Sequence, residues 1–101
     1  MSKQSVLKLW NEHYGNKEDV YDYSGRLMKK SAISNPNSKY EPTIDHVRPL
    51  SLGGKDITDN MVVCSRITNQ EKGDKFSTWS ANGKTYQAIR RKGNRSSYMI
   101  K

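Results

Sequence analysis

The sequence predicts a small α+β domain, and features of its middle third carry that prediction. Residues 42–47 form a short run rich in β-branched side chains, and residues 61–64 form a second apolar run. Runs of this kind, bounded by turn residues, indicate strands. A long loop with a Gly53-Gly54 turn separates them, and residues 65–72 are polar and compatible with a helix. Gly73 is a typical residue just past a helix end.

The N-terminal third is expected to add one helix and one hairpin. Residues 2–14 carry apolar side chains close to helical spacing, and Gly15 follows them as a stop residue. Trp10 is expected to bring this helix into the core. Residues 20–33 predict two short strands joined at Ser24-Gly25.

The C-terminal extension, residues 76–101, is expected to contain a second, basic helix. Residues 86–92 form a short candidate helix that ends at Gly93, with Tyr86 facing inward and basic side chains facing outward. Residues 98–100 are expected to form a short edge strand.

The formal net charge of +8 is unevenly distributed. Residues 1–41 carry +2, residues 42–75 are neutral, and residues 76–101 carry +6 with no acidic residue. A neutral middle beside a basic extension fits a site flanked by a phosphate-binding surface, although a basic tail also serves solubility. No apolar run approaches the roughly 20 residues of a membrane span, no export signal is visible, and the single Cys64 cannot form an internal disulfide. We therefore expect one cytoplasmic domain over residues 1–101, without a membrane partner.

The middle segment holds the residue types that phosphodiester hydrolysis needs. That reaction requires a base to activate water and positive charge at the phosphate. His46 suits the first role because an imidazole titrates within reach of neutral pH. Asp45 and Asn69 offer hard oxygen atoms, which suit Mg²⁺ or Mn²⁺ better than zinc. Adjacent strand residues point to opposite faces, so Asp45 and His46 can share a site only where the strand ends or bulges.

The spacing of these residues resembles the HNH endonuclease motif. Asp45-His46 is followed by Asn60 fourteen positions after the histidine, and by Asn69 nine positions later within Asn-Gln-Glu-Lys-Gly. The resemblance covers about residues 20–75, and the variant with Asn in the last motif position is similar to many phage HNH proteins and to the HNH domain of CRISPR effector nucleases. It implies a ββα-metal (His-Me finger) core at about residues 42–75, in which a helix packs on a two-stranded hairpin around one divalent ion.

The resemblance also implies roles for individual residues. His46 would be the general base, and Asp45 and Asn69 would bind one Mg²⁺ or Mn²⁺ ion that stabilises the phosphate and the departing 3′ oxygen. Asn60 would be the middle catalytic residue, bracing the loop and orienting the histidine. Basic side chains near the motif and in the extension would contact nucleic acid: Arg48, Lys72, Lys75, Arg90, Arg91, Lys92 and Arg95.

One departure from the family concerns zinc. Many HNH domains carry two Cys-x-x-Cys pairs that bind a structural zinc, but here Cys64 is the only cysteine and residues 21–24 replace the first pair. We therefore expect no structural zinc. Tyr21, Tyr23, Cys64 and Ile67 are expected to make an apolar contact in its place.

Each of these residues also has an ordinary structural explanation, as a turn carboxylate, a histidine with its hydrogen bonds satisfied, or a cap. Their joint spacing is what favours an endonuclease that acts on double-stranded or structured DNA. Two alternatives stay open: a DNA-binding module that keeps the scaffold without turnover, and a nuclease subunit active only with a partner. A basic RNA-binding protein finds no support from a known RNA-module motif. The resemblance leaves open a homodimer or a larger phage or restriction assembly in a bacterial or phage-infected cell.

Overall fold

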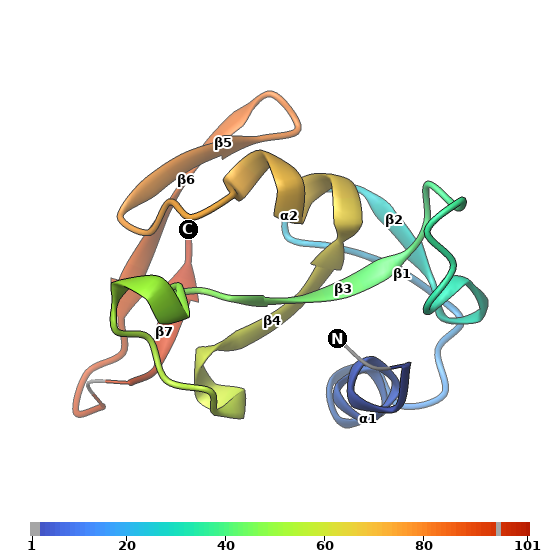
Figure 1. The fold of residues 1–101 in the computed structure, drawn as a ribbon, viewed down its shortest axis with the longest axis horizontal. Coiled ribbons are helices and arrows are strands. Elements are labelled where there is room, and N and C mark those ends of the chain that lie inside the picture. The colour runs from blue at the N-terminus through green and yellow to red at the C-terminus, as the bar shows by residue number, and fades with distance from the viewer. Residues whose placement is uncertain (1–2, 95) are drawn as a thin grey trace.

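The computed structural model describes residues 3–94 and 96–101, which form two helices and seven strands (Figure 1). In chain order these elements are α1 (Lys3–Tyr14), β1 (Asp19–Tyr21), β2 (Leu27–Lys29), β3 (Pro42–His46), β4 (Met61–Ser65), α2 (Arg66–Lys72), β5 (Thr78–Ala81), β6 (Lys84–Arg90) and β7 (Tyr98–Ile100). The strands make three antiparallel sheets, β1-β2, β3-β4 and β5-β6-β7. Among the described helices, none has the length and apolar character needed to cross a bilayer.

The β3-β4 hairpin lies at the centre, between the two helices. Its register runs from the Pro42–Ser65 pair to the His46–Met61 pair. Figure 1 shows α2 on one side of this hairpin and α1 on the other. The predicted order of strand, loop, strand and helix is therefore observed, and the predicted N-terminal helix and hairpin are confirmed. The arrangement matters because the end of β3 has α2 on one side and α1 on the other.

The hydrophobic core lies between α1 and the central hairpin. Val6, Leu9 and Trp10 of α1 pack against Ile44 of β3 and Val63 of β4. These α1 residues stand at positions i, i+3 and i+4, so they share one helical face. Trp10 is completely buried, and its indole nitrogen donates to the Lys17 carbonyl at 2.9 Å, which satisfies the one polar atom that burial would otherwise leave unpaired.

A buried carboxylate joins the β1-β2 turn to the start of α2. Asp22 Oδ1 accepts hydrogen bonds from the backbone and hydroxyl of Ser24 and from the backbone of Arg26, while its Oδ2 accepts from Ser65 N and Thr68 Oγ1. Burial alone would raise the pKa of Asp22, but the hydrogen bonds from Thr68, Ser24 and the backbone outweigh it and hold the pKa below its usual value. Five hydrogen bonds on one carboxylate thus tie together segments that are distant in sequence.

This carboxylate network corrects the expected apolar contact among Tyr21, Tyr23, Cys64 and Ile67. Tyr21 is 68% exposed and takes no part in the interior. Cys64 is completely buried, and burial raises the pKa of its thiol, as expected for a small buried hydrophobe. Tyr23 instead contacts the third sheet, accepting a 2.9 Å hydrogen bond from the indole of Trp79. The region is therefore organised by a polar residue, Asp22.

The expected basic helix at residues 86–92 is wrong, because these residues lie in and just after strand β6. Asn82 and Gly83 have φ angles of 51° and 76° and form the two-residue turn of the β5-β6 hairpin. A two-residue hairpin turn of type I′ needs left-handed backbone at both positions, which Asn-Gly supplies. Tyr86 then pairs with Trp79 across the hairpin. The turn chemistry therefore decided the conformation, and the predicted strand at 98–100 is confirmed as β7.

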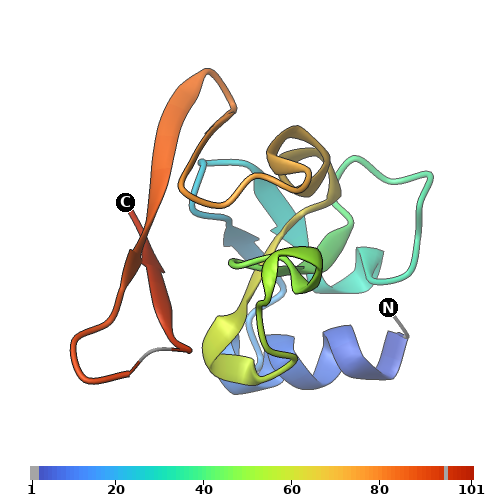
Figure 2. The same ribbon diagram turned by 60° about the vertical axis from the view of Figure 1, so that its left-hand side comes forward.

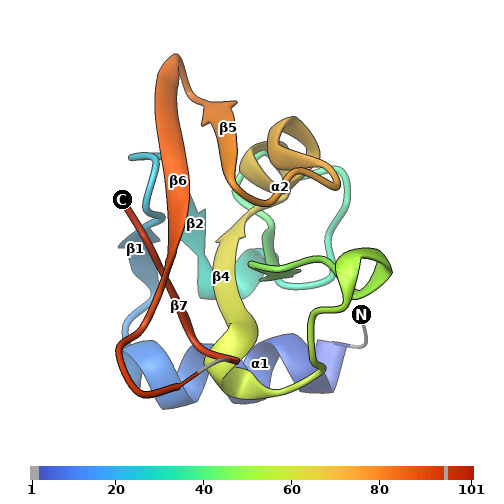
Figure 3. The same cartoon turned by 90° about the vertical axis from the view of Figure 1, so that its left-hand side faces the viewer.

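The third sheet forms one flank of the molecule. In Figure 2, β6 and β7 stand to one side of the helices and the central hairpin, and Figure 3 shows β5 lying beside α2. Glu71 of α2 links the sheet to the rest of the protein, because its carboxylate accepts from the Asn82 backbone and pairs with Arg26.

Candidate active site

The predicted chemical residues meet in a pocket where β3 ends beside α2. The pocket has a volume of about 340 Å³ and is lined by residues from β3, from the segment after it and from the C-terminal end of α2: Ile44, Asp45, His46, Pro49, Leu50, Ser51, Asn69, Gly73 and Asp74. Asp45 and His46, the last two residues of β3, both line this pocket. The structure thus brings Asp45, His46 and Asn69 together.

Asp45 is a buried carboxylate whose Oδ2 has an ionic partner but no well-directed hydrogen bond. Its Oδ2 lies 3.1 Å from Lys72 Nζ, yet no donor among the described residues meets that oxygen in hydrogen-bonding geometry. Burial raises the pKa of Asp45, and the positive charge of Lys72 opposes that rise. Asp45 therefore presents a buried acceptor that a cation could satisfy.

Lys72 is buried with Asp45. Its side chain is completely enclosed, and its ammonium also donates to the His46 carbonyl at 3.3 Å and lies 5.1 Å from the centre of the Trp79 ring. The expected contact between Lys72 and nucleic acid is therefore not supported by its position, because the ammonium is turned inward and presents no surface to a phosphate. Its observed role is to balance the charge of Asp45.

Asn69 is held by β3 through its amide nitrogen. Nδ2 donates to Thr43 Oγ1 at 3.0 Å and to the Ile44 carbonyl at 3.3 Å. These two contacts engage the donor end of the carboxamide, so its oxygen is the atom left available at the pocket. Thr43 is in turn anchored by donating to the Cys64 carbonyl at 3.0 Å.

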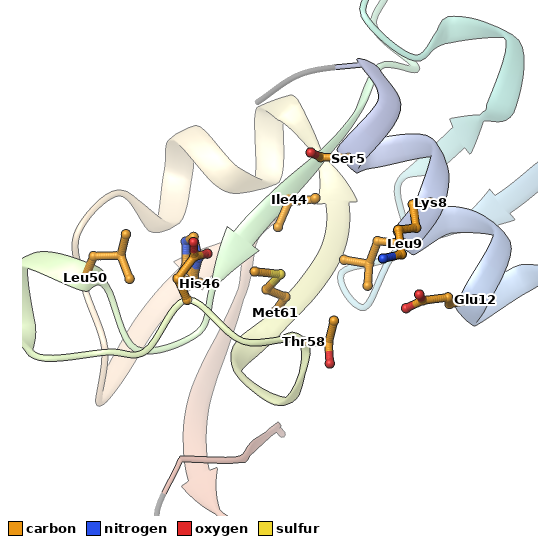
Figure 4. Close-up of a pocket in the computed structure, with 10 residues that line it drawn as sticks. Ser5, Lys8, Leu9, Glu12, Ile44, His46, Leu50, Thr58 and Met61 are labelled. Carbon is orange, nitrogen blue, oxygen red and sulfur yellow. The ribbon is translucent and has the colours of Figure 1, made fainter.

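His46 is fixed by a carboxylate from the loop that follows β3. Its Nε2 lies 2.8 Å from Asp56 Oδ1, and its side chain is only 13% exposed. The ring also lines a second pocket of about 390 Å³ between α1 and the central hairpin. Figure 4 shows His46 and Leu50 on one side of that pocket and Lys8, Leu9 and Glu12 of α1 on the other. The imidazole thus forms part of the wall between the two pockets.

Asn60 lies behind the site and clasps the loop. It is completely buried; its Oδ1 accepts from Arg48 N at 2.9 Å, and its Nδ2 donates to the carbonyls of Arg48 and Lys55 at 3.0 and 2.9 Å. Its own carbonyl accepts from Val47 N. A single carboxamide therefore connects both ends of the loop between His46 and β4.

The other expected nucleic-acid contacts differ in their exposure. Arg48 is half-buried, donating from Nε to the Leu52 carbonyl at 2.8 Å, with its guanidinium 5.6 Å from the centre of the Phe76 ring. Arg95 lies outside the described residues. The remaining four side chains are exposed: Lys75, Arg90, Arg91 and Lys92.

The donor set of the pocket fits a hard divalent cation. The described residues contain no group of three or more His, Cys, Asp and Glu side chains that could hold a metal ion, so any ion here would have few protein ligands of these types. One carboxylate and one carboxamide suit Mg²⁺ or Mn²⁺, because such ions keep several waters and take further oxygen ligands from phosphates. The buried Asp45 Oδ2 and the available Asn69 oxygen meet that requirement.

Sequence reasoning missed two residues that hold the site together. Thr43 lies two positions before Asp45, so strand alternation already placed both on the face toward α2. Asp56 is the only acidic residue in 47–58, but no spacing rule connects a loop residue to His46. The first could have been found from the sequence, whereas the second depends on the path of the loop.

The fold and the pocket define a small α+β protein with a polar site built from a β-hairpin and the helix that follows it. The model of the HNH endonuclease family matches residues 22–78, more than half of the chain. The chain therefore belongs to the HNH endonuclease family, and the earlier resemblance is confirmed. Comparison with curated proteins and with solved structures found no match. Family membership indicates a nuclease, a hydrolase that acts on nucleic acid, and nucleases of this family generally use divalent metal ions.

Proposed function

We propose that the protein is a divalent-metal-dependent endonuclease that hydrolyses phosphodiester bonds of double-stranded or structured DNA. The observation that carries the proposal is the meeting of Asp45, His46 and Asn69 in one pocket, since the three come from two different elements and supply a base and two oxygen ligands. The proposal treats residues 1–101 as one nuclease domain.

In this proposal His46 takes the proton from the attacking water. An imidazole suits this task because its neutral form has a lone pair at physiological pH. The ring cannot swing freely, because Nε2 is held by Asp56. His46 therefore begins the reaction in a restricted orientation, which lowers the entropic part of the barrier.

Asp45 and Asn69 would hold one Mg²⁺ or Mn²⁺ ion through their oxygen atoms. When bound, such an ion supplies positive charge at the phosphate and at the departing 3′ oxygen. Asp45 must be ionised to serve as a ligand, although its burial favours the protonated form. The Lys72 ammonium, 3.1 Å away, favours ionisation. Lys72 thus acts by keeping the ligand charged.

The basic surface of the third sheet would hold the DNA backbone. Arg90 ends β6, and Arg91 and Lys92 follow it, all three exposed. Exposed cations of this kind contribute sequence-independent affinity through phosphate contacts. Lys75 lies exposed three residues beyond the end of α2, next to Asp74 of the pocket.

The test is cleavage of supercoiled plasmid by the purified protein in Mg²⁺, Mn²⁺ or EDTA, with a single-stranded RNA as a parallel substrate. We expect metal-dependent nicking that is lost in His46→Ala, Asp45→Ala and Asn69→Ala while DNA binding in a gel-shift assay persists. His13→Ala is the matched control, because His13 is the other histidine and lies exposed on α1. A wild-type protein that shifts DNA but never cuts it with either metal would refute the catalytic proposal. A non-catalytic DNA-binding module or a partner-dependent nuclease subunit would then replace it.

A further inference from the structure

We propose that Asp56 is the positioning residue of His46: it accepts the Nε2–H of the imidazole and so fixes the tautomer whose Nδ1 carries the lone pair. The proposal rests on the proposed function, in which His46 is the base. It adds a residue outside the motif and assigns the nitrogen that takes the proton.

The contact itself is short but not a source of stability. Asp56 Oδ1 lies 2.8 Å from His46 Nε2, and the Asp56 side chain is 72% exposed whereas that of His46 is 13% exposed. An ion pair with a carboxylate this exposed contributes little to folding stability. The pairing therefore adds little to the stability of the fold. Its main effect is to orient the His46 ring.

The backbone next to Asp56 is held in place by the Asn60 side chain. The Asn60 amide donates to the carbonyl of Lys55, the residue immediately before Asp56, at 2.9 Å. The same amide is locked to Arg48 at the other end of the loop. Because Asn60 is completely buried, the backbone that carries the carboxylate is tied to the interior of the protein.

The chemistry of the pair selects one tautomer. A neutral imidazole has one nitrogen that donates and one that accepts, and an ionised carboxylate only accepts. Asp56 therefore requires the proton of His46 on Nε2, which leaves Nδ1 as the nitrogen able to receive a proton from water. The same carboxylate stabilises the imidazolium once that proton has been taken up, as the third member of a catalytic triad does.

The first test is nitrogen NMR of the ¹⁵N-labelled full chain without metal, at a pH where both imidazoles are neutral. The protein has two histidines, His13 and His46, so the ring signals can be assigned with one His13→Ala variant. We expect His46 to show the Nε2-protonated tautomer in the wild type and a mixture of tautomers in Asp56→Ala. Asp56→Asn keeps an acceptor oxygen and is expected to preserve the tautomer in part.

The second test is plasmid nicking, with rates measured at several DNA concentrations. Asp56→Ala is expected to lower kcat by roughly 10- to 100-fold, because a base held in the wrong form or orientation loses part of its catalytic effect. KM is expected to stay within about twofold, since Asp56 makes no binding contact in this proposal. Asp59→Ala is the matched control: it removes the same charge from the same loop, but Asp59 contacts Asn94 at 3.4 Å and not His46.

The outcomes separate this proposal from the proposed function. If the wild type cuts DNA and Asp56→Ala keeps either its His46 tautomer or its kcat, the positioning role is overturned while the nuclease stands. If the wild type never cuts, the proposed function fails and the positioning role falls with it. A changed tautomer together with a reduced kcat, and neither effect in Asp59→Ala, supports it.

Discussion

Thr68 Oγ1 donates a 2.7 Å hydrogen bond to Asp22 Oδ2, joining α2 to the β1-β2 turn across 46 residues of sequence. Ser65, the N-cap of α2, donates its backbone N–H to the same oxygen. In this way one buried carboxylate fixes where α2 begins relative to the first hairpin. Residues 21–24 stand where the family resemblance would place a zinc-binding cysteine pair, and here they carry this hydrogen-bonded carboxylate.

Asp22→Ala is expected to destabilise the protein by about 3 kcal/mol, because it leaves several buried donors without an acceptor, each at a cost of roughly 1 kcal/mol or more. Urea denaturation followed by circular dichroism measures the change. Asp19→Ala is the control, since Asp19 forms only an exposed pair with Lys29 at 3.1 Å and is expected to change stability by less than about 1 kcal/mol. Equal effects of the two substitutions would show that the Asp22 network is not a structural centre.

The same network predicts how stability depends on pH. The pKa of Asp22 is lowered in the folded protein, so its contribution is present above the unfolded pKa, about 3.9, and is lost as pH falls through the lower folded pKa. We expect the free energy of unfolding of the wild type to fall below about pH 4 more steeply than that of Asp22→Asn, which has no carboxylate to protonate there. Urea titrations between pH 6 and pH 3 test this, and parallel curves would contradict it.

Asp45 and Lys72 are expected to be strongly coupled. Lys72→Met leaves the Asp45 carboxylate buried without its counter-charge and further raises the pKa of Asp45, and removal of one partner of a buried pair costs about 3–5 kcal/mol. Asp45→Asn leaves the Lys72 ammonium buried without a negative partner. The double variant buries no unpaired charge, so its loss of stability is expected to be well below the sum of the two single losses. A double-mutant cycle by urea denaturation measures the coupling, and additive losses would exclude it.

Gly54→Ala is expected to displace the loop that carries Asp56. A Cβ atom at Gly54 would lie 1.8 Å from the Arg48 carbonyl oxygen, and a backbone atom cannot move aside as a side chain does. We expect a loss of at least about 2 kcal/mol together with reduced nicking. Gly83→Ala is the control: its Cβ would meet nothing within 4 Å, so only the left-handed backbone costs about 1 kcal/mol. Comparable stability and nicking in the two variants would contradict the tight fit of Gly54.

Replacing Arg90, Arg91 and Lys92 with Gln is expected to weaken DNA binding at every sequence. Each lost phosphate contact lowers the slope of log affinity against log salt by about 0.9, so the triple variant is expected to lose up to three such increments. Fluorescence anisotropy at several salt concentrations measures both quantities. Lys39→Gln is the control, because Lys39 is exposed in the loop before β3. Figure 1 shows that loop on the opposite side of the view from β6 and β7. An unchanged slope in the triple variant would exclude this surface.

The sequence by itself determined the order of the central elements and the residues that approach the pocket. Short β-branched and apolar runs, the Gly53-Gly54 turn and Gly73 are local signals, and each acts over a few residues, so strand, loop, strand and helix followed from them. Placing Asp45 at the end of β3 and Asn69 in α2 then required only the antiparallel register. The error at residues 86–92 arose where two local signals disagreed, because helix-compatible side chains were given more weight than the Asn82-Gly83 turn.

Tertiary structure alone decided what these residues contact. The inward turn of Lys72 toward Asp45, the hydrogen bond from Thr68 to Asp22, and the pairing of Asp56 with His46 join residues between 10 and 46 positions apart. Nothing in the local pattern distinguishes a lysine that faces water from one that balances a buried carboxylate, because burial is a property of the packed elements together. The chemistry of the pocket was thus visible in the residue types, whereas its charge balance and the orientation of its base depended on the path of the folded chain.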